Sequence, residues 1–307
     1  MNKLNNRVTI GFVNFNNGKF VEECIQSVIA QDSGPFRMIF VDNASTDGSF
    51  EHVKEKFGDL LEWISLKENR GPNPARNIIL KKANTEFVLF LDADVVLEKD
   101  VVSKLVASIE AHPQAAVASP LVLDYENRTK VQFCGTLIHY IGAAIHPNKV
   151  FDDTYEVSSL GGACLLVRKS VADKIQGWDE DLFFGWTDGD FVYRMVLAGY
   201  KALCVSKAKI YHPYKKRGLS RAYHQIRNRW YFMLKTYSWR TLLLIFPVIF
   251  FYEMLLLVFL TLKKQSFTYF KANFSILLSL PQILKKRHYI QNLRKLRDRD
   301  TLTIGNI

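Results

Sequence analysis

The sequence of 307 residues lacks acidic residues over a long internal stretch, because no Asp or Glu occurs between Asp190 and Glu253. Basic residues are frequent there, and they include Lys207, Lys209, Lys215, Lys216, Arg217, Arg221, Arg227, Arg229, Lys235 and Arg240. The net charge of +11 is therefore unevenly distributed. A one-sided positive field favours anionic partners, namely nucleic acid, an anionic lipid leaflet or a diphosphate substrate. Charge alone does not select among these three.

Paired cysteines are also missing. The four cysteines are far apart in the sequence, at Cys24, Cys134, Cys164 and Cys204. Neither a disulfide framework nor a thiolate zinc site fits this spacing. We expect buried thiols in a reducing compartment.

The start of the sequence has no long apolar run. The stretch Val8–Val13 is too short for the core of a signal peptide and is followed by polar residues. No internal repeat or low-complexity segment is present. We therefore expect the N-terminal part of the chain to remain in the cytosol.

The first third of the sequence alternates between strand and helix patterns. Strands are predicted at Arg7–Val13, Phe36–Val41, Leu61–Leu66 and Phe87–Leu91. Helices are predicted at Gly18–Gln31 and Ser49–Phe57, and a third helix begins with Asn73 as cap and Pro74 at its first position. Later helices are predicted at Lys169–Gln176 and Gly189–Ala198, followed by a strand at Lys201–Val205. This alternation predicts an α/β fold with a parallel sheet and helices on its faces.

Polar residues follow three of these strands. They are Asn14–Asn17, Asp42–Gly48 and Asp92–Asp94. Ligands of parallel sheets bind beyond the carboxyl ends of the strands, so all three segments are expected to face one crevice.

Asp92 and Asp94 are two residues apart at a strand end. In extended backbone their carboxylates project to the same side and share one hard divalent cation with phosphate oxygens. This pattern favours a nucleoside diphosphate site. The alternative is that the two residues only form a turn or cap a helix.

A second acidic pair, Asp188 and Asp190, follows the aromatic segment Trp178–Trp186 and opens a helix. One such carboxylate is explained by helix capping, but not both. A carboxylate walled by aromatic rings is partly desolvated and so suited to accept a proton from a hydroxyl. The rings also stack on sugar faces, although Trp and Phe are equally common in a plain core.

The order and spacing of three segments resemble family 2 glycosyltransferases of the GT-A fold, including rhamnosyltransferase-like members. The segments are Val41–Ser49, Asp92–Asp94 and Gly177–Asp190, with further matches at Asn69–Gly71, Ala75–Asn77, Gly161–Ala163 and His212. The resemblance covers about residues 7–235. It implies a Rossmann-like, mostly parallel sheet with flanking helices. It also implies an inverting transfer of sugar from a nucleoside-diphosphate sugar to a hydroxyl of a glycan or lipid-linked acceptor, in cell-surface polysaccharide synthesis.

The resemblance assigns roles to individual residues. The nucleotide sugar is expected at Asn14, Asp42, Asn43, Arg76, Asp92 and Gly162, where Asp42 contacts the nucleobase and Arg76 supports the diphosphate. Asp94 is the expected ligand of a Mn or Mg cation. His212 is either a second metal or diphosphate contact or a structural residue. The expected acceptor residues are Trp186, Asp190 and Arg227.

Asp188 is the expected catalytic base. It deprotonates the acceptor hydroxyl, which attacks the anomeric carbon directly and inverts it. No Ser or Cys nucleophile is needed for such a step. The sequence departs from the family pattern at Thr187, where an acidic residue often precedes the base, and at Arg70–Pro72.

The C-terminal part is apolar and basic. We divide the chain into a catalytic domain at residues 1–235 and a membrane-associated helical segment with a basic tail at 236–307. The run Thr241–Leu262 spans about 33 Å at 1.5 Å per residue, enough to cross a bilayer, but Pro247 and Glu253 interrupt it. Basic residues flank both ends, which disfavours a single crossing. A hairpin with Phe267–Leu284 or a helix in the interface removes that conflict, and a buried bundle or oligomer contact is the alternative.

The expected partners are a nucleotide sugar, a glycan or polyprenyl-diphosphate-linked acceptor and the cytoplasmic face of a membrane, without nucleic acid. Arg221–Trp230 is expected beneath the active site, either holding the acceptor diphosphate or forming a solvated basic face.

Two other functions compete with this one. A sugar-phosphate nucleotidyltransferase requires a glycine-rich basic loop after the first strand, and Asn14–Gly18 is not one. A noncatalytic anion- or lipid-binding module gains nothing from carboxylates in its cleft.

Overall fold

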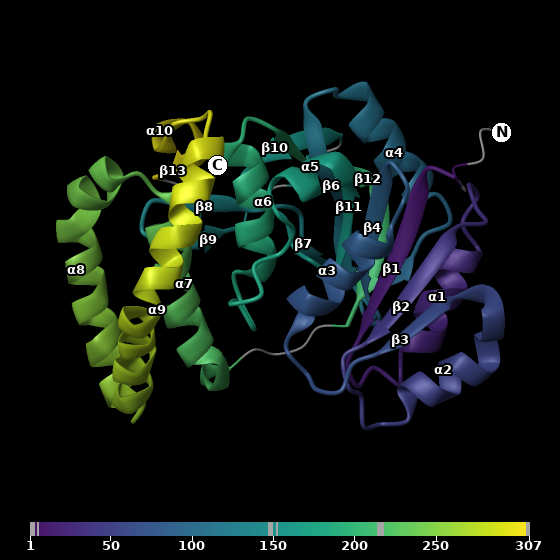
Figure 1. Ribbon diagram of the computed structural model, residues 1–307, viewed down its shortest axis with the longest axis horizontal. Helices are drawn as coiled ribbons and strands as arrows, with labels where there is room; N and C mark the ends of the chain where they lie inside the picture. Colours follow the sequence, from purple (N-terminus) through teal and green to yellow (C-terminus); the bar gives the residue numbers. More distant parts are fainter. Residues whose placement is uncertain (1–3, 5, 147–149, 152, 214–217, 305–307) are drawn as a thin grey trace.

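The computed structural model describes residues 4, 6–146, 150–151, 153–213 and 218–304 (Figure 1). The predicted basic residues Lys215, Lys216 and Arg217 lie outside the described residues. The fold is α/β, with a central sheet covered by helices on both faces and a group of C-terminal helices at one end (Figure 1).

The central sheet is mixed. Its main strands follow the spatial order β10 (Thr154–Val157), β12 (Lys201–His212), β6 (Ala115–Asp124), β11 (Cys164–Arg168), β4 (Phe87–Asp92), β1 (Val8–Asn14), β2 (Arg37–Asp42) and β3 (Glu62–Ser65). Two short strands complete it, β5 (Val96–Leu97) on β12 and β7 (Val131–Phe133) on β6. The strands β4, β1, β2 and β3 are parallel, as predicted. The strand β11 is antiparallel to β4, because the chain re-enters the sheet after the long excursion between β6 and β11.

Helices cover both faces of this sheet. Helices α1 (Val21–Ile29), α2 (Ser49–Phe57) and α4 (Val101–Ala111) bury their apolar side chains in one core. Helices α3 (Pro72–Lys82), α5 (Lys169–Lys174) and α6 (Thr187–Leu197) form the second core on the other face. Every residue of β1 is buried, which explains its continuous apolar sequence. Gly11 of β1 is required by close packing, because a Cβ atom there would lie 2.2 Å from Ile79 of α3.

Two predicted boundaries are wrong. Helix α3 begins at Pro72, with Gly71 preceding it at a φ of 83°, a conformation that favours glycine. Asn73 does not cap this helix; its side chain instead donates to the carbonyl groups of Asp179 and Leu182. Strand β12 continues past the predicted end at Val205 to His212, because its second half pairs with β6 and β5.

The C-terminal third forms helices that pack beside the sheet domain. They are α7 (Ala222–Thr236), α8 (Trp239–Leu262), α9 (Ser266–Leu293) and α10 (Asp298–Thr301). Strand β13 (Leu302–Thr303) then joins β8 (Leu137–His139), which also pairs with β9 (Ala144–Ile145). The described chain also contains single 3-10 turns at Gly58–Leu60 and Leu219–Arg221.

Helix α8 meets the length and composition of a membrane span. Within the described residues it is the one helix that does so, with a mean hydropathy of 2.6 in an 18-residue window of which 11% is buried. Length and hydropathy do not by themselves distinguish a span from a helix that lies on a surface.

Candidate active site

The predicted polar residues at the ends of β1 and β2 lie together. The Asn14 amide donates to Asp42 Oδ1 at 2.9 Å and to the Ser45 hydroxyl at 3.1 Å. Asp42 also accepts from the backbone N–H of Ser45 at 2.9 Å. Both Asn14 and Asp42 are buried, so the sequence 42–48 is held as a fixed turn at the edge of the sheet.

Asn43 joins this turn to the next loop. Its amide donates to Asn69 Oδ1 at 2.8 Å and to the carbonyl group of Gly71 at 3.0 Å. Asn69 in turn accepts from the backbone N–H of Gly71 at 2.9 Å. The loop that precedes α3 is therefore positioned by the residues that follow β2.

Arg76 lies at the centre of the site and holds two carboxylates. Its guanidinium donates to Asp188 Oδ1 at 2.6 Å and to Asp92 Oδ1 at 2.9 Å. It also stacks over the ring of Trp178, 4.4 Å from the ring centroid, and the side chain is only 3% exposed. The end of β4 and the start of α6 are thus brought together by one buried cation.

Asp188 requires a glycine opposite it. A Cβ atom on Gly162 would lie 2.2 Å from Asp188 Oδ1, so only glycine admits the carboxylate at this position. The Gly162 carbonyl accepts from Arg76 at 3.3 Å. The structure therefore gives Gly162 a contact with the expected base rather than the open approach to a ligand that the sequence suggested.

Asp92 has several charged groups nearby. Enclosure at the cavity floor raises the pKa of Asp92 above its ordinary value, and the charges of Asp94 and Asp188 act in the same direction. Arg76 opposes this shift. Arg76 faces Asp92 and Asp188, and Asp94 lies close to Asp92, so the carboxylates outnumber the arginine and favour a bound cation or a basic group.

Asp94 and His212 come together from distant segments. His212 Nε2 at the end of β12 lies 3.7 Å from Asp94 Oδ1, and the two side chains are 16% and 5% exposed. His212 Nδ1 contacts Gln132 Oε1 at 3.1 Å. No group of three or more His, Cys, Asp or Glu side chains among the described residues is arranged to hold a metal ion. One carboxylate and one imidazole nevertheless suit a Mn²⁺ ion that shares its remaining positions with phosphate oxygens and water.

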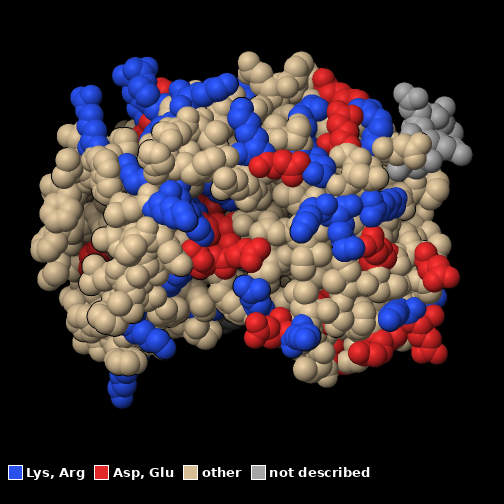
Figure 2. Space-filling view, in the orientation of Figure 1, with Lys and Arg blue, Asp and Glu red and all other residues tan. Residues whose placement is uncertain are grey.

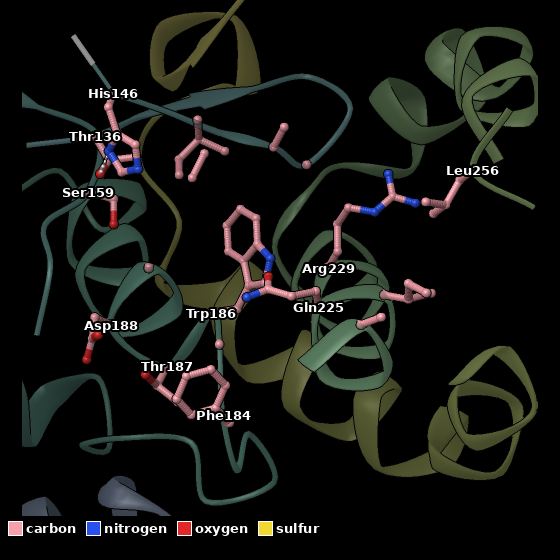
Figure 3. Close-up of a pocket in the computed structure, with 18 of the residues that line it drawn as sticks. Thr136, His146, Ser159, Phe184, Trp186, Thr187, Asp188, Gln225, Arg229 and Leu256 are labelled. Carbon is pink, nitrogen blue, oxygen red and sulfur yellow. Dashed lines mark hydrogen bonds between the residues drawn. The ribbon is translucent and has the colours of Figure 1, made fainter. Parts of the chain in front are cut away.

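A cavity of about 860 Å³ opens beside these carboxylates. Asp188 lies at one end, and Trp186 projects into the middle (Figure 3). Arg76 and Asp92, which are joined to Asp188 by hydrogen bonds of Arg76, also line the cavity. The opposite end is formed by α7 and α8, which contribute Arg229 and Leu256 (Figure 3). This volume is within the range of small-molecule pockets.

Trp186 is held in place by residues of α7. Its backbone has a φ of 61° and its ring stacks on Phe232 of α7, with the centroids 4.4 Å apart. The loop before it is fixed by Asn228, whose amide donates to the carbonyl groups of Phe184 and Gly185 at 2.7 and 3.0 Å. A fixed aromatic ring beside a carboxylate is a suitable platform for a sugar face.

Two predicted acceptor residues do not line this cavity. Asp190 is fully buried, 2.8 Å from Arg194 Nε and 2.7 Å from Lys235 Nζ. Arg227 points towards α9, where it donates to Ser275 at 3.2 Å. It also donates to the carbonyl group of Asp181, in the loop before α6, at 3.0 Å. Both residues join elements of the fold, so the geometry gives neither a contact with an acceptor.

Four further residues contribute to the cavity, and of these only His146 lies outside the stretch Arg221–Trp230 that the sequence indicated. Gln225 and Arg229 of α7 and His146 line it, and Asn228 positions its aromatic loop. Gln225 and Arg229 belong to the basic stretch that the sequence placed beneath the site. His146 carries no local signal, because the chain brings it there only through the excursion between β6 and β11.

Comparison with known proteins matches the chain over residues 9–176 to the model of glycosyl transferase family 2. The chain is 26% identical over 186 residues to an N-acetylglucosaminyltransferase of Azorhizobium caulinodans, covering 58% of this chain and 46% of that protein. It is 33% identical over 102 residues to the poly(ribitol-phosphate) beta-N-acetylglucosaminyltransferase TarS of Staphylococcus aureus, covering 32% of this chain and 18% of TarS. The chain thus spans less than half the length of these relatives.

Solved structures share the fold. GalNAc-T7 crystallised with UDP, GalNAc and Mn²⁺ superimposes with a TM-score of 0.64 at 17% identity, covering 76% of this chain and 48% of that chain. A fragment of S. aureus TarS in complex with UDP-GlcNAc gives a TM-score of 0.53 at 23% identity, covering 74% and 64%. The fold is that of the GT-A glycosyltransferases. Together with the family match over more than half of its length, this places the chain in glycosyl transferase family 2.

Proposed function

We propose that the protein is an inverting glycosyltransferase that moves a sugar from a nucleoside-diphosphate sugar to an acceptor hydroxyl in cell-surface polysaccharide synthesis. The observation that carries the proposal is the position of Asp188, which lines the cavity while Arg76 ties it to Asp92. Relatives in this family include TarS and a poly-beta-1,6-N-acetyl-D-glucosamine synthase of Staphylococcus epidermidis.

In the proposed reaction, Asp188 is the base. Arg76 holds the carboxylate by Oδ1. Oδ2 is left to take the proton from the acceptor hydroxyl. The hydroxyl oxygen forms a bond to the anomeric carbon as the bond to the diphosphate breaks, and the configuration inverts. Trp186 supports the acceptor sugar. Asn14, Asp42 and Asn43 at the sheet edge hold the nucleoside.

Asp94 and His212 are proposed to hold a divalent cation, Mn²⁺ or Mg²⁺, together with the donor diphosphate. Such a cation supplies positive charge beside the departing diphosphate. Calorimetric titration of Mn²⁺ in the presence of UDP is expected to show binding that Asp94→Ala weakens and that Asp59→Ala, at an exposed position, leaves unchanged. Equal affinity in both variants would remove Asp94 from the site.

The test of the reaction is transfer from UDP-, GDP- and dTDP-sugars with and without a divalent cation. We expect one donor to be consumed and Asp188→Asn to lower kcat by about 10² to 10⁴, the usual contribution of a general base. Asp59→Asn, an exposed aspartate away from the cavity, is the matched control. A fully active Asp188→Asn variant would refute the assigned base, and a protein that neither binds nor consumes any donor would favour a noncatalytic binding module.

We also propose that residues 236–307 hold the catalytic part, residues 1–235, at the cytoplasmic face of a membrane. The acceptor is then a glycan or a polyprenyl-diphosphate-linked glycan. The support is the apolar, largely exposed helix α8 and the basic composition of the segment. Several relatives are enzymes that synthesise polymers of the cell surface, which suits this location.

A further inference from the structure

The helices α8 and α9 form a hairpin with an unusual distribution of side chains. Large apolar residues project outwards along both helices, and many are more than half exposed. They include Leu243, Leu244, Phe246, Phe250, Phe251 and Leu255 on α8, and Phe267, Phe270, Phe274, Leu277 and Leu278 on α9. Figure 2 shows this end of the molecule as a mostly uncharged surface with Lys and Arg above and below it. An apolar face of this extent is unfavourable in water and requires a cover.

The buried charged residues of the hairpin point the other way. Glu253, in the middle of α8, is buried and forms an ion pair with Arg229 of α7, and it also accepts from Trp230 Nε1 at 2.9 Å. Arg229 donates in addition to the carbonyl group of Ile141 at 2.9 Å. The acidic residue that interrupts the apolar run therefore attaches α8 to the catalytic part.

Helix α9 is attached in the same way. Lys286 donates to Asp181 Oδ2 at 2.6 Å and also pairs with Asp179. Arg287 donates to the carbonyl groups of Leu234 and Tyr237 at the end of α7, both at 2.6 Å. The polar side of α9 thus lies against α7 and the loop that carries the aromatic residues.

The hairpin is attached to the catalytic part along its whole length. At its base, Ile249 and Ile290 join a buried cluster with Phe232 of α7. At its tip, Leu260 and Ala272 join a second cluster with Ile226 of α7. Because one side of the hairpin is bound to protein from base to tip, lipid can surround only the outer side.

Both ends of the hairpin also lie at one place. The backbone N–H of Ser238, just before α8, donates to Asp298 Oδ2 at 2.8 Å, and Asp298 follows α9. The next residues of the chain return to the catalytic part, where β13 pairs with β8. A single crossing would put Ser238 and Asp298 on opposite sides of the membrane, which this contact excludes.

The charge of the hairpin identifies the partner that covers it. The sequence holds no Asp or Glu from residue 254 to residue 297, and the hairpin also has exposed basic residues at Lys263, Lys264, Lys271 and Lys285. A second copy of the chain placed symmetrically on this face would bring like charges together. Anionic lipid headgroups instead neutralise these basic residues while the acyl region covers the apolar residues.

We propose that α8 and α9 lie in the plane of an anionic bilayer, in one leaflet, with the Arg229–Glu253 pair and the α7 contacts holding the catalytic part above them. The position of the hairpin adds to the proposed function. The route of the acceptor given below rests on that function. Tyr252, Leu256, Phe259 and Leu260 of α8 also line the cavity that contains Asp188. The membrane-bound helix is therefore a wall of the acceptor cavity, and an amphiphilic acceptor reaches the base from the leaflet in which its apolar chain remains.

The first experiment measures binding of the purified full chain to sealed vesicles by flotation, without donor. Vesicles of phosphatidylcholine are compared with vesicles that also contain phosphatidylglycerol. We expect stronger binding to the anionic vesicles. For the double variant Phe251→Ser and Leu255→Ser we expect a loss of about tenfold or more in affinity, because the substitutions remove two large apolar side chains from the exposed face. The double variant Ile29→Ser and Leu60→Ser removes exposed apolar residues elsewhere and should bind like the wild type.

Thermal unfolding of each variant shows whether the fold is retained, and light scattering gives the oligomeric state. Unchanged vesicle binding by the folded Phe251→Ser and Leu255→Ser variant overturns the proposal. A dimer that this variant dissociates, without vesicle binding by the wild type, also overturns it in favour of a second copy.

A second experiment separates a hairpin in the plane from one that crosses. The native cysteines are all buried, so Lys263→Cys at the exposed tip introduces one accessible thiol. With the protein bound to sealed vesicles from outside, an impermeant maleimide should label this thiol as fully as the one introduced by Glu55→Cys on α2. Protection of the Lys263→Cys thiol until detergent is added would show that the tip has crossed, and would overturn the proposal.

The two proposals fail separately. Vesicle binding without consumption of any donor refutes the glycosyltransferase reaction and leaves the in-plane hairpin standing. Consumption of a donor by a protein that does not bind vesicles refutes only the hairpin.

Discussion

The sheet domain and the α8–α9 hairpin distribute their side chains in opposite ways. In the sheet domain the apolar residues of β1, β2 and β4 are buried between two helical layers, and polar residues collect at the strand ends. In the hairpin the charged residues Glu253 and Arg287 are buried against α7, and the Phe and Leu residues face outwards. Both arrangements bury the groups that the surroundings do not solvate. The difference therefore indicates that the hairpin is adapted to a medium other than water.

The largest effect expected from this comparison is on the buried ion pairs of α7, whose partner Asp179 also pairs with Lys286 of the hairpin. Lys235 of α7 is completely buried between Asp179 and Asp190. Replacing it in Lys235→Met leaves two buried carboxylates without their shared cation, and loss of one partner of a buried pair costs about 3–5 kcal/mol. Urea unfolding should show this loss, whereas Lys207→Met, at an exposed lysine, should lie within about 0.5 kcal/mol of the wild type. Equal stability of the two variants would show that the buried pairs of Lys235 do not stabilise the fold.

The second effect concerns catalysis without a large change in stability. Gly162→Ala places a methyl group where Asp188 Oδ1 lies, so the carboxylate must move out of its contact with Arg76. We expect kcat to fall by about 10²-fold, as for other displacements of about 1 Å at a reacting group. Gly34→Ala is the matched control, since Gly34 lies outside the cavity lining and a Cβ atom there would be in ordinary contact, 3.4 Å from Phe36. A normal kcat for Gly162→Ala would mean that Asp188 is not the base or is not needed in this position.

The smallest effect is a dependence of stability on pH. Burial alone would raise the pKa of Asp179, but the ammonium groups of Lys235 and Lys286 outweigh it and hold the pKa well below its usual range. The stabilisation is therefore complete above the ordinary aspartate pKa of about 3.9, and it is lost as the pH falls below that value towards the folded-state pKa. The difference in unfolding free energy between wild type and Asp179→Asn should be constant near neutrality and shrink below about pH 4. The same difference measured for Asp59→Asn, an exposed aspartate, should show no such decrease.

The residues that could be predicted from the sequence are those whose position depends on the end of a strand. Asp42 and Asp92 end buried strands, and the parallel arrangement of β1, β2 and β4 brings their ends to one edge. The position of that edge follows from the order of strands and helices along the chain, which can be read from the sequence pattern.

The predicted acceptor residues Asp190 and Arg227 lie away from the cavity for a different reason. Asp188 and Asp190 are both on α6, where residues two apart point roughly 200° away from each other. One faces the cavity and the other the core, so both cannot meet the acceptor. Arg227 and Arg229 differ in the same way on α7, with one directed to α9 and the other to α8 and the cavity. The helix boundaries predicted from sequence were too approximate to show this.

The contacts of the hairpin could not be predicted at all. The sequence shows that Glu253 interrupts an apolar run, but not that Arg229, twenty-four residues earlier, is its partner. Pairs of this kind depend on how α7 and α8 are packed, which no local pattern records. The same is true of β13, whose partner β8 is far away in the sequence.

Helix α7 has neighbours on several sides at once. Asn228 holds the loop before Trp186, Arg229 contacts α8, and Arg227 contacts α9. A substitution on α7 that suits a new acceptor therefore alters the support of the hairpin, and the reverse is also true. In evolutionary terms, we expect the acceptor wall and the hairpin to change together among related proteins. The hydrogen bonds of Asn14, Asp42 and Asn43 instead join the strand ends to the loop before α3, so we expect the turn that follows β2 to change with the nucleotide.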